Sequence, residues 1–275
     1  MSAIKSYFKE ELQPRNLGVD HTKPSDFYLS VWQTNRSSAP LLFLRTLIFL
    51  TSIGIVLASI TIYIQKGQFS FWFIYLTHWG LSVMTFASFF SVVVSARCYF
   101  YGPLSSEFLL PWYARVYWLL FNVAVPIAFL ITLFYWTVLF EAGIEEELNH
   151  GLDVAVHGIN TLLMFLLLFT SSHPSRLLHF YQPTCFAFTY FLFTAVYFLA
   201  GGTDAKGHPY IYPVVDWTYP GTTVGVGALT GLLLIVLYLL VVAIAKGRDV
   251  ISRKYVKPPP IAEEAGVPLR QQTVV

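Results

Sequence analysis

The sequence predicts an all-α membrane protein, a bundle of six transmembrane helices with both termini in the cytoplasm. Hydrophobic residues make up 56% of the 275 residues and charged residues only 12%, whereas an average soluble domain carries roughly a quarter charged residues. The apolar residues form six runs, each close to the ~20 residues that cross a bilayer core. Lys and Arg gather on one side of these runs. The net charge of +2 gives no indication of a nucleic-acid partner.

Residues 1–40 are expected to form a cytoplasmic N-terminal tail. Ile4, Tyr7, Phe8 and Leu12 recur at helical spacing between charged residues. This pattern predicts a short helix on the membrane surface, and a frayed tail is the alternative. The tail has no apolar segment of the kind that a cleaved signal peptide contains, so we expect the first span to direct membrane insertion.

The transmembrane domain is predicted to cover residues 41–245. Its six spans are expected at 41–64, 71–96, 114–140, 153–170, 184–200 and 222–245. Pro126 lies near the centre of the third span, where neighbouring helices can satisfy the carbonyl that a proline leaves free. Residues 246–275 are predicted to form a cytoplasmic C-terminal tail, and its three successive prolines cannot continue a helix.

The orientation follows from the distribution of basic residues. With six spans, the two tails and the loops after the second and fourth spans share one side of the membrane. Every Lys and Arg except Lys66 and Lys206 lies on that side or at an adjoining helix end, so that side should be cytoplasmic. Cys98 and Cys185 fall there too and are expected to be reduced. Cys98, just past a predicted span end, is a candidate for palmitoylation.

Two sequence features predict partners besides membrane lipids. Gly227 and Gly231 form a GxxxG pair in the sixth span, which lets another helix approach closely. We favour packing within the chain, and a homo-oligomer seam is the alternative. Thr273, Val274 and Val275 fit a PDZ-domain ligand, because a hydroxyl residue stands two positions before an apolar C-terminus. An unstructured end is the alternative.

Polar side chains inside two spans are candidates for a functional site, because such residues usually face the bundle interior or water. The second span contains Thr77 and His78, and the fourth contains Asp153 and His157. Asp153 and His157 are four residues apart and therefore share one helical face. Both spans enter from the outer side, so at 1.5 Å per residue Thr77 and His157 lie roughly 6–10 Å below the outer boundary.

A hydroxyl and an imidazole at this depth are the minimum for cleaving a lipid ester. Thr77 would attack the carbonyl and His157 would remove its proton. Asp153 could orient the imidazole as the third member of a triad. Alternatively, the threonine bonds a backbone carbonyl and the histidine bonds another helix, with no chemistry involved.

A metal site is a weaker interpretation, and we predict no cofactor. His150, Asp153 and His157 could line one helical face, with His208 or His78 completing a set of ligands, but the spacing is not a specific zinc signature. The sequence has no Walker loop and no GxSxG, HExxH or CxxC motif. No inverted repeat indicates a transporter.

Several segments together resemble the rolling stone family. They are Tyr-Leu-Thr-His-Trp at 75–79, Pro126, the run from His157 to Arg176, and Tyr-Ile-Tyr-Pro at 210–213. The resemblance implies a plasma-membrane protein of embryonic muscle with a role in myoblast fusion, which is the leading functional expectation.

A wider similarity covers about residues 70–247. It is to the androgen-induced and androgen-dependent membrane hydrolases, which cleave fatty acid esters of hydroxy fatty acids. Thr77 matches the nucleophilic threonine of those hydrolases and His157 matches their catalytic histidine. This similarity implies intramembrane hydrolysis of lipid esters as the alternative function.

Overall fold

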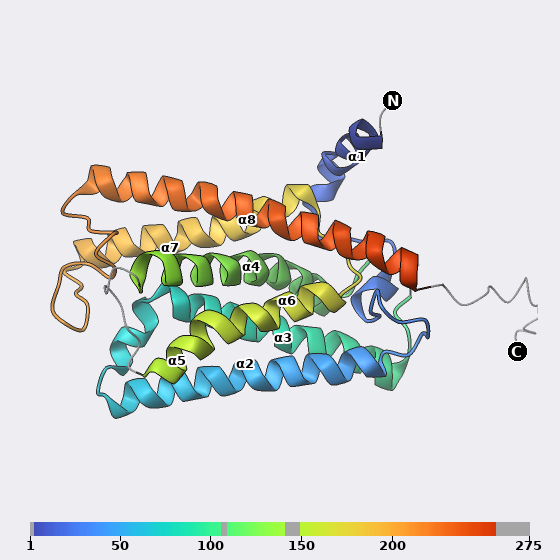
Figure 1. Cartoon of the computed structure of the whole chain (residues 1–275), viewed down its shortest axis with the longest axis horizontal. Helices are drawn as coiled ribbons and strands as arrows, with labels where there is room; N and C mark the ends of the chain where they lie inside the picture. The colour runs from blue at the N-terminus through green and yellow to red at the C-terminus, as the bar shows by residue number, and fades with distance from the viewer. Residues whose placement is uncertain (1–2, 106–108, 141–148, 257–275) are drawn as a thin grey trace, which may run out of the picture.

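A computed structural model describes residues 3–105, 109–140 and 149–256 of the chain. Six helical segments in these ranges are long and apolar enough to cross a membrane (Figure 1). They are α2 (Ala39–Gln65), α3 (Leu76–Tyr101), α4 (Trp112–Phe134) with its continuation to Leu139, the segment from His150 to Thr170, α7 (Tyr181–Leu199) and α8 (Pro220–Tyr255). The described residues contain no strand. The predicted all-α, six-span fold is therefore confirmed.

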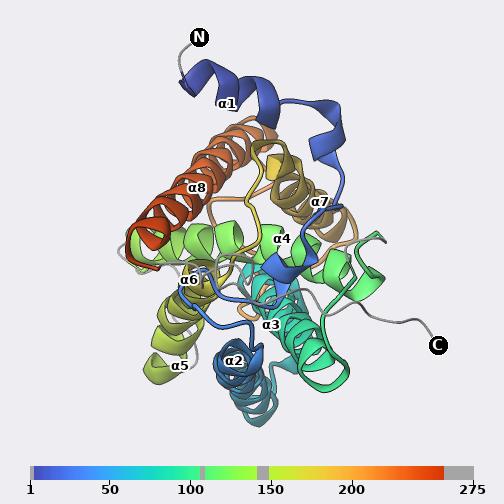
Figure 2. The same ribbon diagram turned by 90° about the vertical axis from the view of Figure 1, so that its right-hand side faces the viewer.

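Helix α4 lies at the centre of the bundle, with the other long helices around it (Figure 2). Its residues Ala124, Val125 and Ile127 are fully buried. Pro126 lies between them without ending the helix, as expected for a proline inside a span. α3 packs closely against α4 because Gly80 has no side chain, and a Cβ atom there would collide with α4.

The third and fourth spans are each interrupted by a π-helical turn. α4 passes into such a turn at Tyr135–Leu139 (η4). The fourth span consists of α5 (His150–Val154), a π-helical turn at Ala155–Ile159 (η5) and α6 (Asn160–Thr170). π-Helical turns are rare and occur frequently at functional sites. Tyr135 of η4 stacks on His157 of η5, and the candidate site lies at this contact.

The N-terminal tail is helical where the spacing predicts it, in α1 (Ala3–Glu11), and the chain beyond α1 packs onto one end of the bundle (Figure 1). Phe27, in the short helix Pro24–Phe27 (η2), is fully buried and stacks on His173. Arg45 of α2 donates a hydrogen bond to the Phe27 carbonyl at 2.7 Å. The backbone carbonyls of Leu17 and Gly18 also accept hydrogen bonds from the bundle, so the segment between α1 and α2 is held against it.

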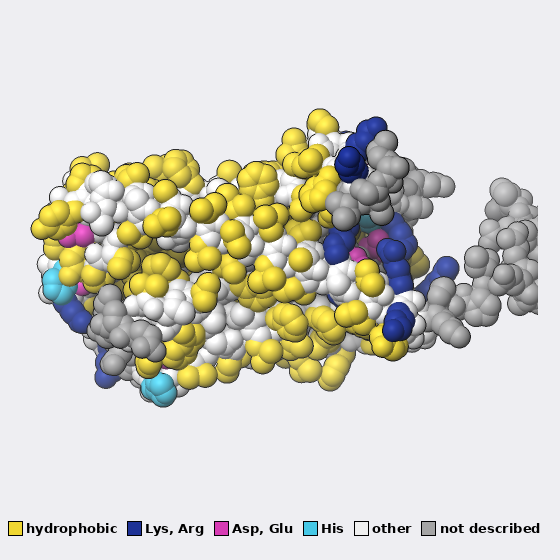
Figure 3. All heavy atoms as spheres, turned by 45° about the horizontal axis from the view of Figure 1, so that its top comes forward, with side chains coloured by type: hydrophobic (Ala, Val, Ile, Leu, Met, Phe, Trp, Pro, Cys, Tyr) yellow, Lys and Arg dark blue, Asp and Glu magenta, His cyan; other side chains and the backbone are white. Residues whose placement is uncertain are grey.

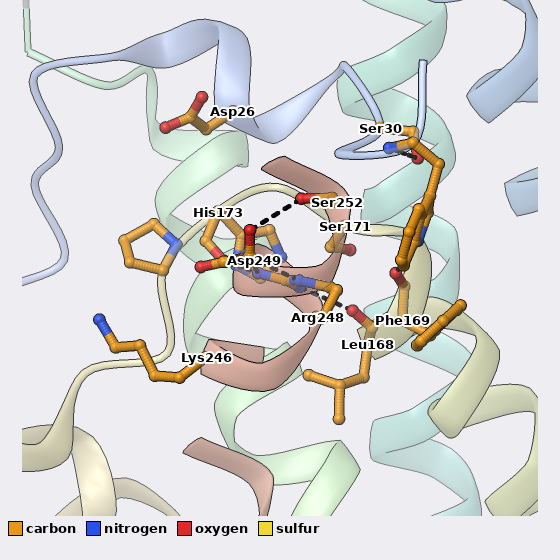
Figure 4. Close-up of polar contacts among 12 residues, drawn as sticks. Asp26, Ser30, Leu168, Phe169, Ser171, His173, Lys246, Arg248, Asp249 and Ser252 are labelled. Atoms are coloured by element: carbon orange, nitrogen blue, oxygen red, sulfur yellow. Dashed lines mark hydrogen bonds and ion pairs between the residues drawn. The ribbon is translucent and has the colours of Figure 1, made fainter. Parts of the chain in front are cut away.

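The last helix is longer than the sequence predicted. α8 continues to Tyr255, past the expected span end at residue 245, so the first part of the predicted C-terminal tail is helical. Arg248 on this extension is buried and donates hydrogen bonds to the Leu168 carbonyl and to Asp249 (Figure 4). This burial ties the extension to the bundle. The proline run and the candidate PDZ ligand lie outside the described residues.

The charged side chains gather mainly at the ends of the bundle, and most Lys and Arg side chains lie at the end that carries α1 and the end of α8 (Figure 3). On the face that Figure 3 shows, hydrophobic side chains predominate between the two ends, as expected of a surface in contact with lipid. At the basic end, Lys246 of α8 pairs with Glu11 of α1 at 3.5 Å. Cys98 lies inside α3 and is buried, whereas Cys185 is exposed.

Candidate functional site

The centre of the candidate site is a buried group of three side chains between the two π-helical turns. The rings of Tyr135 and His157 stack in parallel with their centroids 3.5 Å apart. The Tyr135 hydroxyl donates a hydrogen bond to Asp153 Oδ1 at 2.5 Å. All three side chains are about 2% exposed. The structure thus brings together two of the residues that the sequence singled out, and it adds Tyr135.

The imidazole of His157 lies near both the backbone carbonyl and the carboxylate of Asp153, and only the carbonyl is within hydrogen-bond distance. His157 Nδ1 lies 3.2 Å from the Asp153 carbonyl oxygen and 3.9 Å from Asp153 Oδ1. A hydrogen bond at Nδ1 leaves Nε2 as the nitrogen that can accept a proton. Within the described part of the chain, Nε2 makes no hydrogen bond. A histidine held in this way has the orientation that the base of a triad needs, and the catalytic role of these residues stays a prediction.

Thr77 is placed at the beginning of α3 by the chain reversal before it. Tyr75 has an extended backbone and caps the helix, so Thr77 is in the first helical turn. Serines and threonines deeper in α3, such as Thr85 and Ser88, donate to the carbonyl four residues earlier. Thr77 has no helical carbonyl at that position. Its hydroxyl makes no hydrogen bond to any described residue, and its side chain is 8% exposed.

Thr77 faces an apolar cavity of about 360 Å³. The cavity is bounded by α3, α4, α7, α8 and the loop before α8. Tyr135 also lines it, whereas His157 and Asp153 lie behind Tyr135 and do not. The free hydroxyl of Thr77 and the ring that stacks on His157 therefore face the same space.

The structure does not join Thr77 to His157 by a hydrogen bond within its described residues. Proton transfer between them would require the two side chains to approach when a substrate binds, which is common because catalytic hydrogen bonds often tighten only in the complex. Tyr135 is the residue that touches both sides of the site.

The match to a family model decides the family of the chain. The model described as Protein rolling stone matches residues 2–258. The chain belongs to the rolling stone family. Protein rolling stone of Drosophila melanogaster is 29% identical over 222 residues, which covers 78% of this chain and 79% of the fly protein. No solved structure matches the chain.

The rolling stone match spans the N-terminal segment, all six helices and the helical extension of α8. The family resemblance read from the sequence is therefore confirmed. The chain is a multi-pass membrane protein of this family, as its six apolar helices also indicate.

His78, next to Thr77, has a structural role in this rolling stone family member. Its Nδ1 lies 2.7 Å from the Trp72 carbonyl oxygen, and its ring stacks on the Trp72 indole. Its Nε2 lies 3.4 Å from Ser59 Oγ, so the ring links α2 to the turn before α3. These contacts position Thr77 rather than offer a second base.

The weaker metal candidates do not form a set of ligands among the described residues. His150 is mostly exposed, with Nδ1 4.0 Å from Asp153 Oδ2. His208 lies in the loop before α8 and pairs with Asp204 at 2.8 Å. Partial burial raises the pKa of Asp204, but hydrogen bonds from His208 and Lys206 outweigh it and lower the pKa below its ordinary value. In the described part of the chain, no three His, Cys, Asp or Glu side chains are arranged to hold a metal.

Tyr135 and Thr132 are the site residues that sequence reasoning missed. The Thr132 hydroxyl bonds the His157 carbonyl and the Thr161 hydroxyl, which holds the fourth span against α4. The signal was available, because both residues fall in the outer half of the third predicted span, at the depth of His157. A polar residue at matching depth in a third span is the observation that would have found them.

Proposed function

We propose that this chain is a plasma-membrane protein that takes part in myoblast fusion, with both tails in the cytoplasm. The supporting observation is its membership of the rolling stone family over nearly the whole chain. The basic end of the bundle supports the orientation, since Lys and Arg favour the cytoplasmic side. The described end of α8 lies at the same end as α1, which fits an even number of spans.

The test of this role is rescue of fusion. Myoblasts that lack their own family member should recover multinucleate fibres when supplied with this chain. Antibody staining of the cell surface and interior would confirm that the supplied chain reaches the plasma membrane. Failure of a correctly inserted chain to restore fusion would contradict the proposed role.

The second candidate function is hydrolysis of a lipid ester at Thr77, and one observation favours it. The Thr77 hydroxyl makes no hydrogen bond to the residues that the structure describes, and it faces an apolar cavity beside Tyr135, whose ring stacks on His157. An unpaired hydroxyl at a helix N-terminus is unusual inside a bundle, where hydroxyls normally bond a carbonyl of their own helix.

The proposed reaction has two steps. Thr77 Oγ attacks the ester carbonyl while its proton passes to His157 Nε2, and the alcohol then leaves with that proton. A water molecule attacks the acyl-threonine with His157 again taking a proton, which releases the fatty acid and restores the Thr77 hydroxyl. Asp153 keeps the imidazole oriented through Nδ1 and stabilises its positive charge.

A fluorophosphonate probe tests this activity, because an activated hydroxyl displaces fluoride and keeps the phosphorus. We expect wild-type protein to be labelled, and Thr77→Val and His157→Gln to remain unlabelled. Thr184→Val is the matched control: Thr184 also lines the cavity but donates to the Phe180 carbonyl at 2.8 Å. Absence of labelling in correctly inserted wild-type protein would exclude the hydrolase function.

A further inference from the structure

We propose that the cavity beside α7 and α8 binds one acyl chain of a bilayer lipid, which enters sideways between these two helices. The carbonyl end of that chain would lie near Thr77, and this placement rests on the proposed hydrolase function. Binding of the chain itself depends only on the cavity and on membrane insertion. The two parts can therefore fail separately.

The size and lining of the cavity fit one apolar chain. A volume of about 360 Å³ lies within the range of roughly 300–1,000 Å³ that is typical of small-molecule sites. None of the described residues that line it is charged, so a headgroup has no counter-charge there. Water is disfavoured because apolar cavities stay dry. A helix, about 10–12 Å across, would not fit in this volume.

The cavity reaches the lipid-facing surface of the bundle. Phe188 of α7 and Val224 of α8 both line it, although they are 58% and 53% exposed. The mouth therefore opens between α7 and α8, which lie next to each other in Figure 1. In a bilayer this mouth faces acyl chains, so an occupant can enter without crossing water.

Two of the α8 residues that line the cavity are glycines, and their surroundings differ. A Cβ atom on Gly227 would collide with the Phe191 ring at 2.6 Å, so Gly227 packs against α7 of the same chain. A Cβ atom on Gly231 would meet nothing within 4 Å, so Gly231 borders empty space. Further along α8, Leu234 and Val241 are buried against the core. Space is therefore confined to the outer half of the helix.

The cavity has a polar end at which most hydroxyls are already engaged. The Tyr212 hydroxyl accepts the Leu76 N–H at 3.0 Å, and the Tyr190 hydroxyl donates to the Ile74 carbonyl at 2.7 Å. Thr77 lies at this end, and its hydroxyl, which bonds none of the described residues, can donate to an ester carbonyl.

From this end the cavity runs along α7. Thr184 and Thr194 both line it, and their positions, ten apart in the sequence, are separated by about 15 Å of helix. An acyl chain whose carbonyl lies at Thr77 could therefore extend well into the hydrocarbon layer.

The experiment uses the full chain in phosphatidylcholine vesicles that contain a trace of phosphatidylcholine with a photoreactive diazirine on one acyl chain. After illumination, mass spectrometry maps the labelled residues. We expect labels on the cavity-lining residues of α7 and α8. We expect Gly231→Leu to reduce these labels about tenfold, because its side chain would occupy the volume that the acyl chain needs.

Gly225→Leu is the matched control. A Cβ atom on Gly225 also meets nothing within 4 Å, but Gly225 does not line the cavity. It should therefore leave the labels unchanged. Labels on the lipid-facing side of α2 serve as an internal reference in every variant. Cavity labels that are equal in wild type and Gly231→Leu, or labels found only on outward-facing residues, would overturn acyl-chain binding.

The placement of the carbonyl end is tested separately with Thr77→Val. This variant should keep the cavity labels, because it retains the shape of the side chain, and lose fluorophosphonate labelling. In one outcome, Gly231→Leu reduces the cavity labels but the wild-type protein does not react with the fluorophosphonate. This outcome would support acyl-chain binding and overturn the placement of the carbonyl end at a catalytic Thr77. Fluorophosphonate reactivity without cavity labels would overturn chain binding and leave the hydrolase function standing.

Discussion

Replacement of Tyr135 by phenylalanine should slow the reaction of Thr77 while leaving the fold intact. The substitution removes the hydroxyl that donates to Asp153 Oδ1 at 2.5 Å and keeps the ring that stacks on His157. Asp153 is 2% exposed, so water cannot easily replace the lost donor. A hydrogen bond to a charged group contributes about 1.5–3 kcal/mol.

That free energy can be converted into a rate. A hydrogen bond that is equally strong before and during the reaction does not change the rate, so this free energy is the upper limit of the loss; the limit is reached when the bond serves only to hold Asp153 against the imidazolium that forms as Thr77 is deprotonated. A loss of about 1.5–3 kcal/mol corresponds to a rate about 10- to 160-fold lower, at 1.36 kcal/mol per factor of ten. The assay is the rate of fluorophosphonate labelling of Tyr135→Phe protein in vesicles, compared with wild type.

Tyr238→Phe provides the matched control for this comparison. The Tyr238 hydroxyl also donates a short hydrogen bond, to the Arg176 carbonyl at 2.6 Å, but it lies at the other end of the bundle. The control should label at the wild-type rate. The reasoning is refuted if folded Tyr135→Phe labels as fast as wild type. Equal slowing in both variants would assign the effect to general destabilisation.

Three further predictions concern packing, pH and the N-terminal segment. Gly227→Leu should lower the free energy of unfolding by about 1–3 kcal/mol in a denaturant titration, because the new side chain collides with α7. Gly231→Leu should leave this free energy unchanged. Equal effects of the two substitutions would contradict the close contact between Gly227 and α7. Burial lowers the pKa of His173 well below its ordinary value. Below about pH 6.5 the unfolded chain therefore binds a proton at this residue that the folded chain does not bind. The free energy of unfolding should consequently decrease as the pH is lowered. His173→Gln should show a smaller fall in thermal unfolding temperature between about pH 7.5 and 5, and an unchanged fall would refute this assignment. Arg45→Met should speed hydrogen exchange around Phe27, because the lost charge-assisted bonds stabilise this segment by about 1.5–3 kcal/mol; unchanged exchange would show that packing alone holds it.

The sequence predicted the helices and their number because runs of apolar residues have one stable arrangement in a bilayer. It also paired Asp153 with His157, since four residues of helix place them on one face. It placed the end of the sixth span at residue 245 but did not predict that α8 continues to Tyr255, because a hydropathy pattern ends where charges begin, whereas Lys and Arg continue a helix readily. Arg248 of α8 is buried where it donates to the Leu168 carbonyl of α6, and the sequence of neither helix alone predicts this contact.

The interior of the site was the least predictable part. The π-helical turns that place Tyr135 on His157 depend on packing between α4 and the fourth span, and no local pattern encodes them. The cavity arises from a glycine on α8 opposite α7, which appeared in the sequence only as part of a helix-packing motif. The sequence suggested close approach for both glycines, whereas only Gly227 makes it.

The proposed fusion role, the depth of the site and the entry of lipid all depend on the membrane topology of the chain. The accessibility of epitope tags from outside the cell measures this topology directly. One set of cells would carry a tag at either terminus, and another would carry a tag at Lys206, an exposed residue in the loop before α8. The account predicts that the Lys206 tag is stained on intact cells and that the terminal tags are stained only after permeabilisation. Staining of either terminal tag on intact cells would contradict it.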